Sequence, residues 1–563
     1  TKIGNGSTGP VGDRGAMNST KEEASMRTKI FLMVAGVVAI GLPISAATIP
    51  VTTTDPAPAA DGQCSLIEAI DNANADAATH ADCPAGIGAD TIELASSAVY
   101  ELDEVTVNYF GPNGLPTIGS NVTIEGQNST IRRAPAAPEF RIFVVNSSGN
   151  LTLNDVTFEN GAAGVYAGGA LYNYGGMLML TGSTVTGNSA SGAGGIYNNS
   201  GTVTLTDSEI SFNTGTAGVG GLSSTASTGD AVVVIERSLI HGNYAIDSGA
   251  GGIYSVTGAS HQAELHISGS EITDNTTVYS GGGIRTENTV VTIEDSTFSG
   301  NHAGYFCAGL LLVGGSGDID RTTFSGNTVG NTVDYGTGGG LCVSDNTTKI
   351  SNCTISGNQV FGPSTGQFMS GRGGGLSLIG GAFGAAPTVD TVVIVEDSTI
   401  CDNTAETIGG GISVDRYAGT MGVELQLRNT IVADNSEGGG AVFGNCAEGS
   451  PAVITSTDFN LADDATCNLI GTNDLVVPDV MLAPLADNGG PTWTHQPLSG
   501  SPAVDSGDDL LCSADDQNGN IRPWDGDGSG QVHCDRGAVE LGAPYFHGGF
   551  ETGDTTGWSN TVP

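Results

Sequence analysis

Ser296-Thr-Phe-Ser-Gly-Asn301 recurs almost unchanged as Thr322-Thr-Phe-Ser-Gly-Asn327. Relaxed copies of the phrase end in asparagine along the middle of the chain, and the full set is Asn160, Asn188, Asn213, Asn243, Asn275, Asn301, Asn327, Asn358, Asn403 and Asn435. Neighbouring members lie 25 to 45 residues apart, and a glycine pair follows most of them. A repeat of this length is typical of a solenoid, in which stacked short units share one core.

The residues within one repeat predict strands and turns. Val291 and Ile293 alternate with polar neighbours, which is the pattern of a half-buried strand, and Phe298 restarts the alternation after a bend. Gly300-Asn301 then supplies residue types that tolerate the left-handed backbone of a tight turn. We therefore predict an all-β fold, a right-handed single-stranded parallel β-helix of about ten repeat coils at roughly 4.8 Å per coil. Its turn asparagines should stack and hydrogen-bond from coil to coil as a structural ladder.

The open N-terminal end of such a stack needs a cap. Ser65-Leu-Ile-Glu68 has the form of a capping box, and the residues that follow it place apolar side chains on one helical face. We predict a short amphipathic capping helix over residues 66–73.

The N-terminal region has the pattern of an export signal. A basic segment, Met26-Arg-Thr-Lys29, precedes an apolar run at 30–42 and small residues at Ser45-Ala-Ala47. We predict a signal peptide at 26–47, and the apolar run is short for the alternative, a membrane anchor. The other expected segments are a mis-called or non-native start at 1–25, a flexible lead-in at 48–62, an N-terminal cap with the first coils at 63–150, repeats at 151–440, C-terminal coils at 441–542 and a tail at 543–563.

The cysteines favour disulfides. There are 10, an even number, and none has the spacing of a zinc ribbon. Three pairs lie close in sequence and are the expected bridges: Cys64 with Cys83, Cys446 with Cys467 and Cys512 with Cys534. The pairing of four cysteines inside the repeats stays open: Cys307, Cys342, Cys353 and Cys401.

The charge balance restricts the partners. The chain has 17 Lys and Arg against 60 Asp and Glu, a net charge of −43. This charge argues against nucleic acid and anionic membrane surfaces, and it suits a soluble surface protein or one that gathers Ca²⁺.

Several longer motifs resemble known families. Cys64-Ser-Leu-Ile-Glu-Ala-Ile70 is similar to the N-terminal Cys-Ser-Leu-Arg-Glu-Ala signature of exported bacterial β-helix proteins, with Ile67 in place of the arginine. Gly500-Ser-Pro-Ala-Val-Asp505 and Cys534-Asp-Arg-Gly-Ala-Val-Glu540 resemble the choice-of-anchor Q family. The Phe-x-x-Asn copies resemble polymorphic outer-membrane proteins. These resemblances imply a right-handed β-helix that is secreted or carried to the bacterial cell surface, at the outer membrane or outside it, with no transmembrane span in the mature chain.

Two groups of residues are candidates for chemistry. Asp318 and Asp320 are two apart on a strand and share a face, while Arg321 is expected to face the other way, so a catalytic carboxylate pair competes with a solvated strand edge. Asp525 and Asp527 resemble the start of a calcium loop, although the later bidentate glutamate is missing. A polar surface turn is the alternative there, and we expect no other cofactor.

Two functions from different classes follow. The first is a non-enzymatic adhesin or envelope surface protein that binds a glycan or a protein. The second is a polysaccharide lyase or glycoside hydrolase that acts on acidic polysaccharide. In the first case, the long insertion between Asn358 and Asn403 is the expected binding region, because loops on one face of a solenoid often bind partners.

Overall fold

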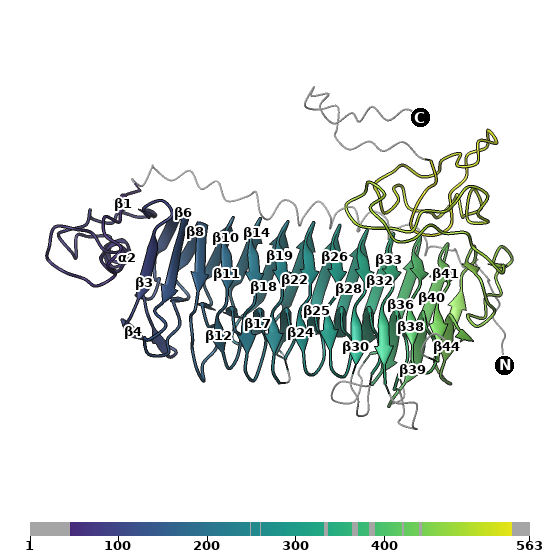
Figure 1. The fold of residues 1–563 in the computed structure, drawn as a ribbon, viewed down its shortest axis with the longest axis horizontal. Helices are drawn as coiled ribbons and strands as arrows, with labels where there is room; N and C mark the ends of the chain where they lie inside the picture. The colour runs from purple at the N-terminus through teal and green to yellow at the C-terminus, as the bar shows by residue number, and fades with distance from the viewer. Residues whose placement is uncertain are drawn as a thin grey trace, which may run out of the picture. The chain divides into compact units, whose positions relative to one another are not determined.

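The computed structural model describes residues 46–247, 249–258, 260–330, 336–362, 370–381, 389–418, 421–438 and 442–542, with the backbone alone at 442 and 443. The expected start at 1–25, nearly all of the signal peptide and the tail at 543–563 lie outside these residues, as do parts of the long insertion. The described residues form a parallel β-solenoid of about 12 turns, built from four columns of strands (Figure 1).

Column 1 contains the longest strands, which pair in parallel from coil to coil. Its members are β1 (Thr48–Pro50), β2 (Asp90–Glu93), β6 (Asn121–Arg133), β8 (Asn150–Glu159), β10 (Met177–Thr181), β14 (Thr202–Thr206), β18 (Ala231–Glu236), β22 (Ala263–Ser268), β25 (Ile284–Glu294), β28 (Leu310–Asp320), β32 (Thr347–Ser351), β36 (Thr391–Glu396), β40 (Val423–Arg428) and β45 (Val453–Ser456).

Column 2 follows a bend and is made of short strands. They are β3 (Val99–Leu102), β11 (Thr184–Thr186), β15 (Glu209–Ser211), β19 (Leu239–His241), β23 (Glu271–Thr273), β26 (Thr297–Ser299), β29 (Thr323–Ser325), β33 (Thr354–Ser356), β37 (Thr399–Cys401), β41 (Ile431–Ala433), β46 (Leu461–Ala462) and β47 (Leu475–Val476). The second halves of β6 and β8 belong to this column as well.

Column 3 follows the asparagine turn and forms a separate sheet of very short strands. They are β12 (Ser189–Ala190), β16 (Thr214–Gly215), β20 (Tyr244–Ala245), β24 (Thr276–Thr277), β27 (His302–Ala303), β30 (Thr328–Gly330), β34 (Gln359–Phe361), β38 (Thr404–Ala405), β42 (Ser436–Glu437) and the antiparallel β43 (Val442–Phe443).

Column 4 closes each coil and leads into the next column 1 strand. It contains β7 (Phe143–Val145), β9 (Leu171–Tyr174), β13 (Ile196–Asn199), β17 (Leu222–Ala226), β21 (Ile253–Thr257), β31 (Leu341–Ser344), β35 (Leu376–Gly380), β39 (Ile412–Arg416) and β44 (Cys446–Glu448), with the first halves of β25 and β28. A small antiparallel pair, β4 (Val107–Asn108) and β5 (Pro112–Asn113), projects near its start.

The core lies inside the four columns and repeats in register. Val203 pairs with Val233, Val233 with Leu265, and Leu265 with Val291, and each is at most 1% exposed. Burying one such aliphatic side chain contributes on the order of 1.5–3 kcal/mol, and parallel pairing keeps equivalent side chains in contact.

The asparagine ladder runs along the turn between columns 2 and 3. The side-chain nitrogen and the backbone N–H of Asn275 both donate to the Oδ1 of Asn301, each at 3.1 Å, and Asn301 donates in the same way to Asn327. This chain of bonds extends from Asn188 to Asn435 and continues to Asn445. Each ladder amide therefore satisfies backbone groups that no strand partner reaches.

Asn160 is not a member of the ladder, contrary to the prediction. Strand register aligns Glu159 with Thr186, so Asn160 takes the position of Gly187 and Gly161 that of Asn188. Asn160 is exposed with a φ of 60°, and the Gly161 N–H donates to Asn188 Oδ1. The asparagine stands one residue early, in the left-handed turn position itself.

A second ladder, at the bend between columns 1 and 2, was not predicted. Here Ser183, Ser208 and Ser238 each accept a hydrogen bond from the backbone N–H of the coil before, and Ser270 and Ser296 continue the series. The residue before each rung adopts a positive φ, as at Asp207 (49°), Arg237 (46°) and Asp295 (49°).

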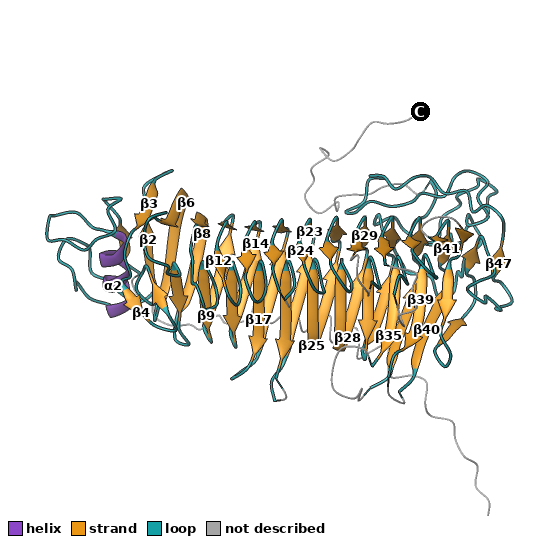
Figure 2. Cartoon of the chain, turned by 60° about the horizontal axis from the view of Figure 1, so that its bottom comes forward, coloured by secondary structure: helices purple, strands orange, loops and turns teal. Residues whose placement is uncertain are grey.

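The N-terminal end has the predicted helical cap. Helix α2 (Leu66–Ala75) begins at Ser65, whose Oγ accepts from the Glu68 N–H while the Glu68 carboxylate accepts from the Ser65 N–H. Its apolar face lies against the first strands (Figure 2). The lead-in at 48–62 is not wholly irregular, because Thr48–Pro50 pairs with β2 as an added strand.

Four disulfides are formed: the three expected pairs, Cys64–Cys83, Cys446–Cys467 and Cys512–Cys534, and in addition Cys307–Cys342. Cys353 and Cys401 are buried free thiols.

The C-terminal region departs from the expected stack of coils. Coils end near β47, and residues 477–542, here called the C-terminal lobe, fold back along column 2 (Figure 1). Thr492 Oγ1 donates to the Arg321 carbonyl, the Gln517 side chain bonds Thr323 and Thr354, and the Asn429 side chain donates to the Asp535 carbonyl. Polar side chains of the lobe, such as those of Thr492 and Gln517, therefore form hydrogen bonds with the solenoid surface, and the lobe adds no further coils. The described part of the chain contains no helix with the length and apolar character to cross a bilayer.

We expect Asn301→Ala to lower the free energy of unfolding by about 3 kcal/mol, because the Asn275 donors and the Ile272 carbonyl each lose a buried partner at roughly 1–3 kcal/mol. Asn160→Gly is the matched control and should be nearly neutral, since glycine suits its left-handed position. Chemical denaturation of both variants measures the difference. Equal stabilities would contradict a contribution of the asparagine ladder to the free energy of unfolding.

Candidate functional site

The outer face of column 4 carries a row of large polar and aromatic side chains. Register aligns Tyr172, Tyr197, Ser223, Tyr254 and Arg285 in five successive coils. Because alternate strand residues point to opposite faces, this row faces out while Leu171, Ile196 and their equivalents fill the core.

The rings in this row contact one another and a projecting loop. The centroids of Tyr172 and Tyr197 are 5.1 Å apart, and Phe110 lies 5.3 Å from Tyr172 and 4.5 Å from Tyr174. Phe110 is 42% exposed and Tyr174 and Tyr197 are partly exposed, whereas Tyr172 between them is buried at 7%. We call Phe110, Tyr172, Tyr174, Tyr197, Tyr254 and Arg285 the aromatic strip.

Two arginines flank these rings as cations. The guanidinium carbon of Arg141 lies 5.0 Å from the Tyr172 ring centroid, and that of Arg285 lies 5.6 Å from Tyr254. Arg141 is fully buried and donates to Asn113 Oδ1 and to three backbone carbonyls, and burial lowers its pKa to about 10, so it remains charged at neutral pH. Arg285 bonds Glu287. Burial also raises the pKa of the Tyr254 hydroxyl, which stays protonated as a hydrogen-bond donor.

The strip ends where the same outward position becomes buried. In the following coils Leu311, Cys342 and Ser377 occupy it, each 0% exposed, and the Cys307–Cys342 disulfide packs there with Leu311. The strip was not predicted, although Gly194-Gly-Ile-Tyr197 and Gly251-Gly-Ile-Tyr254 repeat a tyrosine at one place after the glycine pair.

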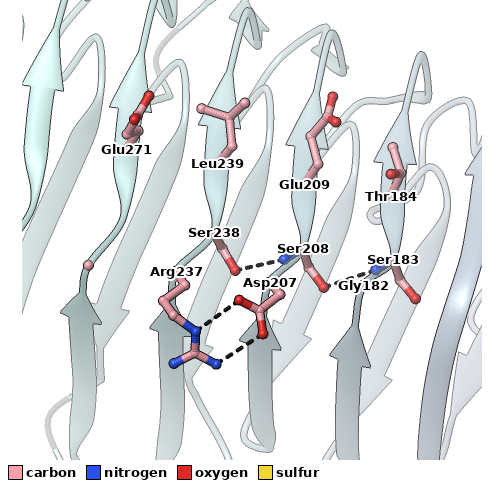
Figure 3. A pocket seen from close by; sticks show the side chains of 11 residues that line it. Gly182, Ser183, Thr184, Asp207, Ser208, Glu209, Arg237, Ser238, Leu239 and Glu271 are labelled. Atoms are coloured by element: carbon pink, nitrogen blue, oxygen red, sulfur yellow. Dashed lines mark hydrogen bonds and ion pairs between the residues drawn. The ribbon is translucent and has the colours of Figure 1, made fainter. Parts of the chain in front are cut away.

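A shallow groove of about 430 Å³ lies at the bend between columns 1 and 2 (Figure 3). Arg237 forms two hydrogen bonds with Asp207, at 2.8 and 3.0 Å, which lower the pKa of that carboxyl. Glu209 and Glu271 line the same groove, and Glu209 contacts His241 at 3.0 Å. The groove is polar and open, and its one arginine is already paired.

The candidate Asp318, Asp320 and Arg321 lie in a network between coils. Arg321 does not face away from Asp320, as expected; its left-handed backbone breaks the strand alternation, and its guanidinium bonds Asp320 at 2.5 Å and Asp295 at 2.6 and 3.1 Å. The other Asp320 oxygen accepts from Ser351 and Asn352. Asp318 is exposed on the same face of β28. Asp320 and Arg321 thus cross-link three coils.

The calcium candidates Asp525 and Asp527 are joined by Asp505, with one oxygen of each within 4.8 Å of the others. Asp505 accepts from the backbone N–H groups of Gly526 and Asp527, while Asp527 accepts from Ser529. These bonds shape a polar turn beside the Cys512–Cys534 bridge. The calcium-loop pattern predicts a third ligand after Asp527. The third carboxylate instead belongs to Asp505, 20 residues before Asp525.

A group of buried acids lies inside the C-terminal lobe. Asp516, Asp535 and Glu540 are at most 1% exposed and surround Arg522, whose Nε is 3.5 Å from Glu540 Oε1 and whose Nη1 is 3.6 Å from Asp397. Burial raises the pKa of Glu540 to about 8 and that of Asp535 to about 6.

The family model described as "Right handed beta helix region" matches residues 90–329 and 196–386, which together span more than half of the chain. This chain belongs to the right-handed β-helix family. The expected handedness and fold are therefore confirmed, while the finer resemblances, to the choice-of-anchor Q family and to the N-terminal signature, stay predictions. No curated protein matches the chain.

Two solved structures are similar in fold. A crystal structure of pectate lyase Pel9A is 13% identical with a TM-score of 0.33, covering 89% of this chain and 98% of its own. The tailspike protein of E. coli bacteriophage HK620, in complex with pentasaccharide, is 11% identical with a TM-score of 0.19, covering 65% of this chain and 74% of its own. These likenesses concern the fold alone.

We expect the stability of the docked lobe to fall as pH rises from 4.5 to 8. In this pH window the folded state keeps the Glu540 proton, whereas the unfolded chain has already released it. The free energy of unfolding therefore falls by about a few kcal/mol across the whole window. Thermal unfolding across this range measures the slope. Glu540→Gln should flatten the slope between pH 6 and 8, whereas Asp535, whose pKa burial raises to about 6, still contributes below pH 6. An unchanged slope between pH 6 and 8 in that variant would show that Glu540 is not its source.

Proposed function

We propose that this chain is a non-enzymatic, exported surface protein that binds a glycan along the aromatic strip. The observation that carries the proposal is the in-register row from Tyr172 to Arg285, with Phe110 beside it. Export rests on the signal-like segment at 26–47 and on the disulfides, which form in oxidising compartments.

The strip has the chemistry of sugar recognition. Tyrosine rings offer apolar faces for the C–H faces of pyranose rings, and their hydroxyl groups bond sugar hydroxyls. Successive coils are about 4.8 Å apart, which is close to the length of one sugar unit in an extended chain. A glycan chain parallel to the solenoid axis would therefore meet Phe110 beside the buried Tyr172, then Tyr197, and then Tyr254 two coils further on, past the small Ser223.

Charge indicates a neutral or weakly charged glycan. The net charge of −43 repels polyanions at long range, and only Arg141 and Arg285 flank the strip. This argues against the alternative, an enzyme for acidic polysaccharide. The carboxylate of Asp320 in the candidate catalytic group is also already paired with Arg321, Ser351 and Asn352.

We expect Tyr197→Ala and Tyr254→Ala each to weaken glycan binding about tenfold, the effect of losing about 1.4 kcal/mol of ring stacking. A glycan array identifies the ligand and titration calorimetry measures affinity. Tyr244→Ala is the matched control, because Tyr244 is 40% exposed on column 3. An equal loss of glycan affinity in all three variants would contradict the proposed site. So would an unchanged affinity in the Tyr197 and Tyr254 variants.

Product assays separate binding from catalysis. Incubation of the wild-type protein with its array ligand and with acidic polysaccharides should yield no new reducing ends and no unsaturated products. Cleavage that disappears in Asp318→Asn and Asp320→Asn would instead establish the enzyme.

A further inference from the structure

A cysteine, a histidine and an aspartate meet where the C-terminal lobe contacts the solenoid. Cys401 ends β37, Asp402 follows it with a φ of 60°, and His495 belongs to the lobe. One ligand atom from each of the three lies within 4.8 Å of the other two. Cys401 and His495 are each only 2% exposed, so these two donors are held in place by surrounding structure.

His495 is oriented as a metal-binding histidine is. Its Nδ1 lies 2.7 Å from the Ala483 carbonyl and donates to it, which leaves Nε2 as the acceptor. Nε2 accepts from Ser356 Oγ at 2.8 Å and lies 3.9 Å from Asp402 Oδ2. Metal-ligating histidines commonly donate their other ring N–H to such a carbonyl. Because Nε2 accepts from Ser356, it carries the lone pair that a metal ion would bind in place of that hydroxyl.

Asp434 lies beside this group and is not a member of it. Its Oδ2 is 4.0 Å from Cys401 Sγ, at the outer limit of a sulfur hydrogen bond. Asp402 is 55% exposed, so one of the three donors is accessible from solvent.

We propose that Cys401 Sγ, His495 Nε2 and the Asp402 carboxylate bind a zinc-class divalent metal ion that fastens the C-terminal lobe to the solenoid. Zinc accepts sulfur, nitrogen and oxygen donors in a tetrahedron with bonds of about 2.0–2.3 Å, so the ligand atoms need to approach by about 1 Å. Calcium is disfavoured because it prefers oxygen donors alone. Binding releases the Cys401 proton and displaces the Ser356 hydrogen bond.

The test uses the full chain, reduced enough to keep Cys401 as a thiol and stripped of metal with a chelator. Zn²⁺ alone is titrated by calorimetry, and Co²⁺ serves as a spectroscopic probe. We expect one equivalent of Zn²⁺, release of a proton, a higher unfolding temperature and a thiolate-to-cobalt charge-transfer band.

Variants locate the site. Cys401→Ser should abolish the charge-transfer band, and Asp402→Asn should weaken Zn²⁺ binding at least tenfold while leaving the His495–Ser356 bond intact. Cys353→Ser is the matched control, because Cys353 is the other buried free thiol and its Sγ bonds the Ile319 and Ser351 carbonyls instead. Asp505→Asn tests whether the oxygen-only group is the true site, and it should leave Zn²⁺ binding unchanged.

Three outcomes would overturn the proposal: no binding of Zn²⁺ by the wild type, a Co²⁺ spectrum without the thiolate band, or full binding by Cys401→Ser. Because Asp402 is exposed, its variant should fold normally, so loss of binding there cannot be attributed to unfolding of the lobe.

Discussion

The backbone groups at the bends of this solenoid depend on the neighbouring coil for their hydrogen bonds. Parallel strands satisfy one another along the columns, but the bends between columns leave backbone N–H groups that no strand partner reaches. Asn301 Oδ1 accepts both donors of Asn275, and Ser208 Oγ accepts the N–H of Ser183. These two ladders hold successive coils in a single register, and that register in turn places every outward side chain in a row. The aromatic strip is a consequence of the same constraint, because tyrosines at one repeat position must line up.

Features formed by residues that are close together in sequence could be predicted. Strand alternation, glycine turns and the Ser65–Glu68 capping box each involve residues near one another in sequence, so the solenoid, its helix and three disulfides could be derived. Asn160 shows where this reasoning ends: the phrase is intact, but one residue of register moves its side chain out of the ladder. The serine ladder escaped notice because serine is common in turns, and only the pairing between coils reveals its role.

The candidate site was harder to predict because it depends on contacts between distant segments. Alternation predicts that Arg321 faces away from Asp320, yet its left-handed bend turns the guanidinium toward that carboxylate. His495 and Cys401 are 94 residues apart and meet only because the lobe folds back. The direction of that fold-back is set by Gln517, Asn429 and their partners across the lobe boundary, and no repeat pattern encodes it.

The fold-back also explains why binding is proposed at the N-terminal half of the solenoid. From Arg321 onward the lobe covers column 2, and the Cys307–Cys342 disulfide with Leu311 fills the outer side of column 4. In the coils from Tyr197 to Arg285 the outward position of column 4 carries three large, partly exposed side chains, Tyr197, Tyr254 and Arg285, with the small Ser223 among them. One half of the rod thus holds the lobe in place through buried polar contacts, and the other presents a regular row of rings. A ligand that binds the rings has no need to disturb the lobe, so lobe docking and glycan binding should vary independently with pH.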